Sequence, residues 1–134
     1  MNEQHGRWVL VTGANGGIGR AICSELALAG YGVLAAVHRP SPHTMERSGR
    51  VRELTLDLTR GQDIAELLVQ LDQLGAGALS GVVHNAGIAL PGAFELAPLE
   101  ETRLQIETNV LGTLQLTHAL LPRLRASRGR IIVI

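Results

Sequence analysis

The residues best suited to chemistry lie near the N-terminus, where a glycine-rich turn follows a short apolar run. The turn reads Thr12-Gly13-Ala14-Asn15-Gly16-Gly17-Ile18-Gly19, and an apolar helical pattern follows it. Closely spaced glycines let the backbone approach a phosphate, and the free N–H groups of a helix N-terminus attract an anion. The order of strand, turn and helix therefore indicates a site for the pyrophosphate of a dinucleotide.

The spacing of the glycines separates this turn from the commoner dinucleotide fingerprint. Gly13, Gly17 and Gly19 follow the pattern G-x-x-x-G-x-G, and no G-x-G-x-x-G can be drawn through the segment. Similar turns also occur as plain connections between a strand and a helix. Taken alone, the turn indicates a class of ligand and no reaction.

Apolar runs alternate with helical patterns along the chain, and this alternation predicts the fold. We expect strands at residues 8–12, 33–37, 52–56, 81–84 and 131–134. We expect helices over 17–29, 63–74 and about 99–125, with a short, weak helix over 43–50. Pro122 is expected to bend or end the last long helix near its last turn.

These elements predict an α/β protein with a doubly wound, Rossmann-like parallel sheet and helices on both faces. For a doubly wound sheet that begins in this way, the expected strand order is 3-2-1-4-5. The ligand site then lies between strands 1 and 4, at their carboxyl ends. One domain over residues 1–134 is expected.

The amino-acid composition argues against several classes of binding partner. Twelve arginines balance twelve acidic residues, and this neutrality argues against nucleic acid or an anionic membrane as a partner. Cys23 is the single cysteine, which excludes an internal disulfide and is typical of a reducing compartment. The five histidines are scattered without metal-ligand spacing, and neither a signal peptide nor a membrane span is recognisable. We expect no metal site and a cytoplasmic location.

Three further motifs follow the glycine turn in a fixed order. They are Asp57-Leu58 after the third expected strand, Asn85-Ala86-Gly87 after the fourth, and Asn109 in the long helix. Together the four motifs resemble the short-chain dehydrogenase/reductase family, in its ordinary-length branch. Segments 109–113, 121–122 and 129–133 agree with the same pattern. The resemblance extends over essentially the whole chain and corresponds to the N-terminal portion of the family pattern.

The resemblance implies that the glycine turn holds the cofactor pyrophosphate. The residues that would do so are Thr12, Gly13, Asn15, Gly17, Ile18 and Gly19. Glycines would form the turn, Ile18 would lie against the cofactor, and Thr12 and Asn15 would supply polar side chains.

The later motifs inherit roles in the same way. Asp57 would accept a hydrogen bond from the adenine amino group, with Leu58 beside the ring. The segment Asn85-Ala86-Gly87 would steady the sheet and line the ribose side, and Asn109 would order a water in a proton relay. Plainer roles remain open: Asp57 as a solvated or helix-capping carboxylate, Asn85 as a structural amide, and Asn109 as a surface polar residue.

The resemblance also implies groups that the chain lacks. Family members carry a serine just past the fifth strand and a Tyr-x-x-x-Lys pair on the next helix. Tyr31 is the only tyrosine, it precedes the second expected strand, and the chain has no lysine. We expect a parent enzyme, a homo-oligomer, that transfers hydride between nicotinamide and a carbonyl or secondary alcohol. The chain itself is expected to be incomplete after Ile134 and inactive alone; the alternative is a non-catalytic dinucleotide-binding or interaction module.

Cofactor choice rests on the residues after the second expected strand. Family members that use NAD usually carry an acidic residue there, whereas this chain has His38 and Arg39. Arg39, together with His38, would meet a 2′-phosphate, which favours NADP over NAD. Gly16 occupies a position where many NADP users have a basic residue, and this argues in the opposite direction.

Overall fold

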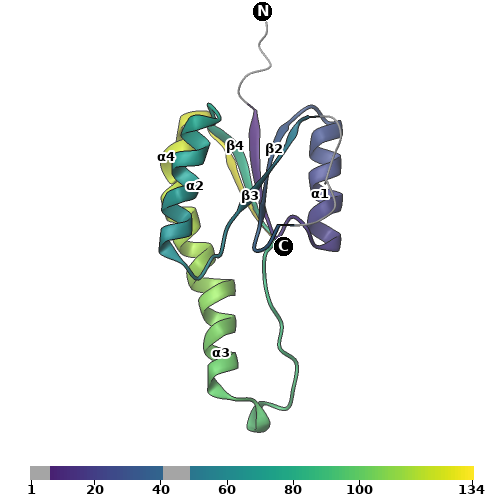
Figure 1. The fold of residues 1–134 in the computed structure, drawn as a ribbon, viewed down its shortest axis with the longest axis vertical. Coiled ribbons are helices and arrows are strands. Elements are labelled where there is room, and N and C mark those ends of the chain that lie inside the picture. Colours follow the sequence, from purple (N-terminus) through teal and green to yellow (C-terminus); the bar gives the residue numbers. More distant parts are fainter. Residues whose placement is uncertain (1–6, 41–48) are drawn as a thin grey trace, which may run out of the picture.

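The sheet is parallel throughout and has the strand order β3-β2-β1-β4-β5. The structure is a computed structural model that describes residues 7–40 and 49–134. The strands are β1 (Trp8–Thr12), β2 (Gly32–Val37), β3 (Val51–Thr55), β4 (Leu79–His84) and β5 (Arg130–Val133). The predicted order 3-2-1-4-5 and the doubly wound, Rossmann-like fold class are confirmed (Figure 1).

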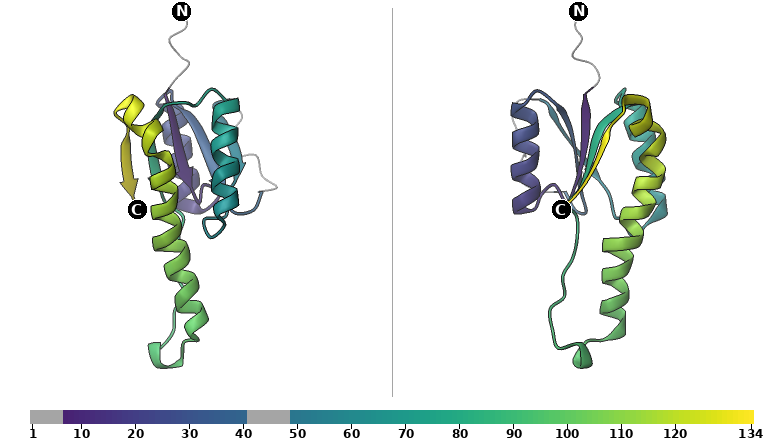
Figure 2. Two further views of the ribbon diagram at one scale, coloured as in Figure 1. Left: turned by 90° about the vertical axis from the view of Figure 1, so that its left-hand side faces the viewer. Right: turned by 180° about the vertical axis from the view of Figure 1, so that it is seen from behind.

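Helices cover both faces of the sheet. They are α1 (Gly17–Leu28), α2 (Gly61–Gln73), α3 (Leu99–Ile106) and α4 (Thr113–Ser127), with a 3-10 turn η1 (Phe94–Leu96) and a π turn η2 (Glu107–Gly112). Figure 2 shows α1 on one face of the sheet and α2 and α4 on the other. The predicted short helix over 43–50 falls almost wholly outside the described residues.

Alternation along the strands builds two apolar layers. Val9 and Val11 of β1 pack with Cys23 and Ala27 of α1, while Leu10 between them packs with the other layer. That second layer joins the sheet to α2 and α4 and contains Leu67, Leu71, Leu116 and Leu120. Because successive side chains point to opposite faces, a strand covered on both faces is apolar throughout.

Pro122 was predicted either to bend the last long helix or to end it, and it lies inside α4. Helix α4 continues past Pro122 to Ser127, so an end at Pro122 is wrong. Proline removes one internal hydrogen bond, but Leu116, Leu120 and Leu124 are buried along one face of α4 and hold it on the sheet. Packing of these leucines therefore keeps α4 helical despite the one hydrogen bond that Pro122 removes.

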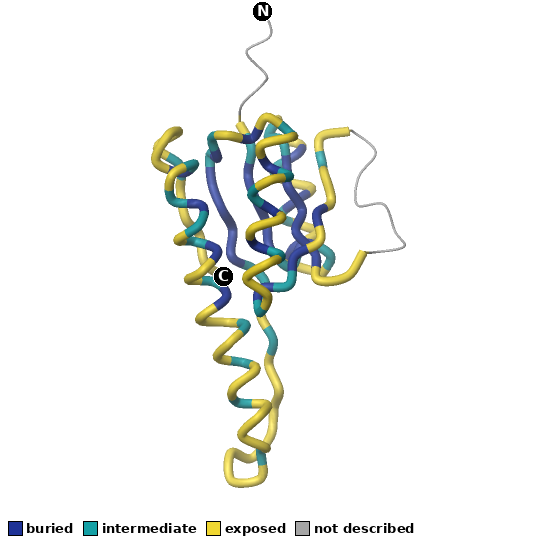
Figure 3. The backbone as a smooth tube through the Cα atoms, turned by 60° about the vertical axis from the view of Figure 1, so that its left-hand side comes forward, coloured by how far each residue is buried: buried dark blue, intermediate teal, exposed yellow. Residues whose placement is uncertain are grey.

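One segment extends well beyond the sheet. The connection from β4 through η1 to α3 projects past the carboxyl edge of the strands, and Figure 3 shows that most of it is exposed. Phe94 and Leu96 at its tip are 83% and 80% exposed.

Within the described part of the chain, no helix is both long and apolar enough to cross a membrane.

Helix α4 ends with an unusual residue in the left-handed conformation. Arg128 has a φ of 53°, and the next N–H, that of Gly129, donates to Leu124 O at 2.7 Å. This is the hydrogen-bond pattern that usually places glycine where Arg128 stands. Gly129 is itself required, because a Cβ there would overlap with Leu79 O.

We expect Arg128→Gly to raise the free energy of unfolding by about 1 kcal/mol, because it relieves the left-handed conformation. Arg125→Gly, in the right-handed last turn of α4, should lower that energy by about 1 kcal/mol. Urea unfolding of both variants checks the pair. A loss of stability in Arg128→Gly would contradict the account.

Candidate functional site

Two adjoining hollows form one cleft along the carboxyl edge of the sheet. The first, of about 280 Å³, lies beside the ends of β1, β2 and β3 and the loop after β4. The second surrounds the glycine turn, and the two share Gly13, Asn15, Ala86 and Gly87. The cleft lies where the connections from β1 leave towards opposite faces, which is the expected ligand position in such a sheet.

The cleft brings together nearly all of the predicted site residues. Those that line it are Thr12, Gly13, Asn15, Gly17, Ile18, Gly19, His38, Asp57, Leu58, Asn85, Ala86 and Gly87. Arg39 and Asn109 do not line either hollow. The carbonyl of Arg39 accepts a hydrogen bond from Asn15 Nδ2 at 3.1 Å, so the backbone after β2 is tied to the glycine turn.

The ends of β1 and β4 are joined by reciprocal side-chain hydrogen bonds. The hydroxyl of Thr12, buried at 1% exposure, accepts from the N–H groups of Asn85 and Ala86 at 3.1 and 3.0 Å. In return, Asn85 Nδ2 donates to the carbonyls of Thr12 and Gly13 at 3.2 and 3.1 Å. These contacts show a structural use for both side chains at the floor of the cleft.

The glycines of the turn differ in what surrounds them. Gly13 has a φ of +61°, and a Cβ there would lie 2.8 Å from Ala86 Cα. A Cβ on Gly19 would overlap with Gly13 O and lie 2.8 Å from Ala14 Cα. A Cβ on Gly17 would meet nothing within 4 Å. Packing within the protein therefore explains why residues 13 and 19 are glycines, whereas the space beside Gly17 is open.

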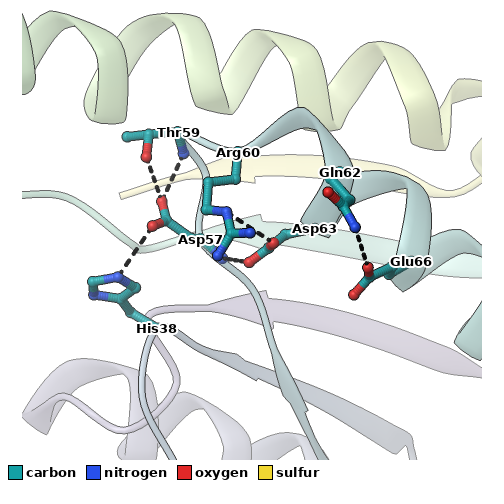
Figure 4. A network of polar contacts seen from close by, with 7 residues as sticks. All are labelled: His38, Asp57, Thr59, Arg60, Gln62, Asp63 and Glu66. Atoms are coloured by element: carbon teal, nitrogen blue, oxygen red, sulfur yellow. Dashed lines mark hydrogen bonds and ion pairs between the residues drawn. The ribbon is translucent and has the colours of Figure 1, made fainter.

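Asp57 lies at the centre of a polar network after β3 (Figure 4). Its Oδ1 accepts from the N–H and the hydroxyl of Thr59 at 2.9 and 2.6 Å, and its Oδ2 lies 3.3 Å from His38 Nε2. Burial raises the pKa of this carboxyl, but the Thr59 hydrogen bonds and the nearby His38 outweigh it and hold the pKa below its usual value. Asp57 is therefore an ionised acceptor at neutral pH.

The network also shows that Asp57 does not cap α2. That helix begins after Arg60, and Asp63 in its first turn reaches back to the N–H of Asp57 at 2.9 Å. The guanidinium of Arg60 lies 3.5 Å from the other Asp63 oxygen. Sequence reasoning missed Asp63, although an acidic residue in a first helical turn is a familiar signal.

Asn109 holds the loop after β4. Its Oδ1 accepts from the N–H of Ile88 at 2.8 Å, and its Nδ2 donates to Ile88 O at 2.7 Å. It lies in the π turn η2, where Gly112 packs so closely on Leu58 that a Cβ would come within 2.6 Å of Leu58 O. Asn109 is exposed, and both polar atoms of its side-chain amide bind the Ile88 backbone. The π turn was not predicted, although asparagine and glycine at mid-helix positions were a signal for an interruption.

His84 is a second buried polar side chain beside the cleft. It is 2% exposed, and its Nε2 lies 2.8 Å from the hydroxyl of Thr117, which in turn donates to Thr113 O at 2.8 Å. Burial lowers the pKa of His84, so the ring is neutral at physiological pH. Thr117 was not singled out by sequence reasoning.

Other reactive side chains lie away from the cleft. Tyr31 precedes β2 at the amino edge of the sheet, where the Arg7 guanidinium donates to its hydroxyl and lies 4.4 Å from the ring centroid. Cys23 lies on the face of α1 that packs against the sheet, and burial raises its thiol pKa to about 11. Among residues 7–40 and 49–134, no cluster of histidine, cysteine or carboxylate side chains is arranged to hold a metal ion.

The comparison with known proteins agrees with this geometry. The family model described as short chain dehydrogenase matches residues 7–134. The chain belongs to the short chain dehydrogenase family. Its similarity to 3-amino-tetrahydro-pyrrolizinone reductase of Xenorhabdus hominickii is 41% identity over 92% of the chain and 43% of that protein. Human 11-beta-hydroxysteroid dehydrogenase type 2 is 39% identical over 96% of the chain and 33% of its own length.

Solved structures of the family show the same fold. A short-chain dehydrogenase from Streptomyces avermitilis matches with a TM-score of 0.84 and 31% identity, over 96% of the chain and 48% of that structure. One from Leptospira borgpetersenii, with bound NAD+, matches in fold with a TM-score of 0.86 at 21% identity, over 99% of the chain and 54% of that structure. The chain thus spans less than half of those curated relatives and about half of the solved structures it matches.

The turn's packing makes a prediction about stability. Gly19→Ala should lower the free energy of unfolding by about 1–3 kcal/mol, because its methyl group overlaps with the backbone of Gly13 and Ala14. Gly17→Ala should change it by less than about 0.5 kcal/mol, because the added methyl group meets only open space. Denaturant unfolding measures both variants. Equal losses of unfolding free energy in Gly19→Ala and Gly17→Ala would contradict the packing described for the turn.

His84 makes a prediction about pH. Because its pKa is lowered in the folded protein, the unfolded chain binds the proton first, and stability should fall as pH drops below about 6.5. His84→Gln keeps a polar amide and cannot titrate, so its stability should fall less over that range. Urea midpoints measured between about pH 7.5 and pH 5 test this. Parallel curves for the two proteins would exclude His84 as the source.

Proposed function

We propose that the chain is the cofactor-binding portion of an NAD(P)-dependent oxidoreductase and that the cleft holds the dinucleotide. The observation that carries this proposal is the continuity of the cleft from the glycine turn to Asp57. A turn suited to a pyrophosphate lies at one end, and an ionised acceptor lies at the other. Membership of the short chain dehydrogenase family supports the same assignment, as does the NAD+ in the structure from Leptospira borgpetersenii.

The residues take the following parts in this proposal. The pyrophosphate lies over Gly17 and the N-terminus of α1, where free N–H groups and open space are available. Ile18, at 62% exposure, lies against the cofactor. Asp57 accepts from the adenine amino group with Leu58 beside the ring, and residues 85–87 line the ribose side. Asn109 supports a proton relay, and its amide already positions the Ile88 backbone.

NADP is the proposed cofactor in preference to NAD. His38 and Arg39 follow β2 and contribute no carboxylate that would accept from ribose hydroxyls. The His38 side chain is 65% exposed and lies over the rim of the cleft beside Asp57. A 2′-phosphate bound here would meet the Arg39 guanidinium, with His38 as a second donor.

The parent reaction is proposed to be hydride transfer between nicotinamide and a carbonyl or secondary alcohol. The named relatives are reductases and dehydrogenases. The chain has no lysine, and its tyrosine lies at the opposite edge of the sheet, so we infer that the chain alone is inactive. A parent that acts in the cytoplasm as a homo-oligomer belongs to the same proposal. The second candidate, a non-catalytic dinucleotide-binding module, is favoured by the same lack of a tyrosine–lysine pair.

Calorimetric titration with NADPH and NADH tests the proposal. We expect NADPH to bind more tightly, and Gly17→Ala to weaken both by about tenfold or more while leaving stability unchanged. Arg39→Ala should weaken NADPH by about tenfold and leave NADH unchanged.

The possible outcomes separate the claims. If neither nucleotide binds, the proposed function is wrong; if NADH binds at least as tightly as NADPH, only the cofactor preference is wrong. Both candidates predict no turnover by the chain alone, so measurable turnover in an activity assay on the same sample would exclude a module that only binds and would contradict the inferred inactivity.

A further inference from the structure

His84 is a buried polar side chain that the proposed function leaves without a role. In the described part of the chain, the buried residues that are polar or charged are Thr12 and His84. Both lie at the carboxyl end of a strand beside the cleft. Thr12 ties β1 to β4, and His84 ties β4 to α4.

The hydrogen bonds around His84 form a short chain. When the hydroxyl of Thr117 donates to Thr113 O, its oxygen accepts from His84, and this arrangement corresponds to the Nε2–H tautomer. Burial lowers the pKa of His84, and the neutral ring then has a bare Nδ1, which has no hydrogen-bond partner. A buried acceptor without a partner costs free energy, so the residue is kept at a cost to stability.

The position of this hydrogen bond points to a purpose. His84 joins the end of β4 to the second turn of α4, and the Asn109–Ile88 pair joins the loop after β4 to the π turn just before α4. Residues 86–88, which lie between these two ties, line the cleft. Both hydrogen-bond ties connect the segment of residues 84–88 to the helical segment of residues 109–117. Residues 86–88, which form part of the cleft wall, are thus held at both ends.

We propose that His84 is a positioning residue of the nucleotide cleft, which fixes residues 86–88 through its hydrogen bond to Thr117. This proposal rests on the proposed function for its effect on binding. Apolar packing has no preferred direction, whereas a hydrogen bond sets both distance and angle. A leucine at residue 84 would fill the core, but it would make no hydrogen bond to Thr117 of α4.

Substitutions of Thr117 test this tie without altering the histidine. Thr117→Val has nearly the same shape and lacks the hydroxyl, whereas Thr117→Ser keeps it. We expect Thr117→Val to weaken NADPH binding by about fivefold to tenfold, and Thr117→Ser to stay within about twofold of the original protein. Arg123→Met is the matched control, because it removes the contact of α4 with Asp72 of α2, away from the cleft.

Nuclear magnetic resonance supplies a readout that needs no ligand. Thr117→Val should shift the Ile88 amide and the Asn109 side-chain amide signals, and Arg123→Met should not. The ring nitrogen signals of His84 in the unsubstituted protein should report the Nε2–H tautomer.

The proposal is overturned if Thr117→Val binds NADPH normally and leaves those amide signals unchanged, or if Arg123→Met weakens binding as much. If the unsubstituted protein binds no nucleotide, the proposed function fails, and the Ile88 and Asn109 signals still decide the role of His84.

Discussion

The structure of the cleft depends on the reciprocal hydrogen bonds between Thr12 and Asn85 at the ends of β1 and β4. Backbone hydrogen bonds join β1 to β4 only along the strands themselves. Beyond the strand ends, the segment after β1 leads to α1 on one face of the sheet, and the segment after β4 leads to α4 on the other. The Thr12 hydroxyl and the Asn85 amide satisfy backbone groups across that divergence. The Thr12 hydroxyl and the Asn85 side-chain amide both find partners, which is the usual condition for polar groups at this depth.

The close packing of the glycine turn follows from this tie. Gly13 approaches Ala86 so closely that no side chain fits, and Gly19 then packs on Gly13 and Ala14. The N-terminus of α1 is thereby fixed relative to β4, and Gly17, Ile18 and Gly19 of its first turn line the cleft. Gly17 alone among these three has open space beside it, which is why we assign the ligand's pyrophosphate to that position.

Much of the fold was predictable because the strands are buried on both faces. A continuous apolar run such as residues 33–37 has few alternatives to a buried parallel strand, and α2 has clear helical spacing with glycines after its end. The strand order followed from the alternation of strands and helices. An end of the last helix at Pro122 was wrong, because the burial of Leu116, Leu120 and Leu124 outweighs the local break.

The site was predictable in part, for a different reason. Gly13, Asp57 and Asn85 stand at fixed places after strands, so their meeting at one edge follows from the topology. Asp63, Thr117 and the π turn were not predicted, because they act through contacts between segments far apart in the sequence or through a local change in helical pitch. The pattern of one helix or strand does not carry that information.

The central claim is that the two hollows act as one dinucleotide site held open by the strand-end ties. The most direct measurement is to map amide signal changes by nuclear magnetic resonance during a titration with NADP+. We expect changes confined to the glycine turn, residues 38–39, residues 56–59 and residues 85–88, with the amino edge near Tyr31 unaffected. Changes centred on the amino edge or on the outer surfaces of α2 and α4, or no changes at all, would contradict it.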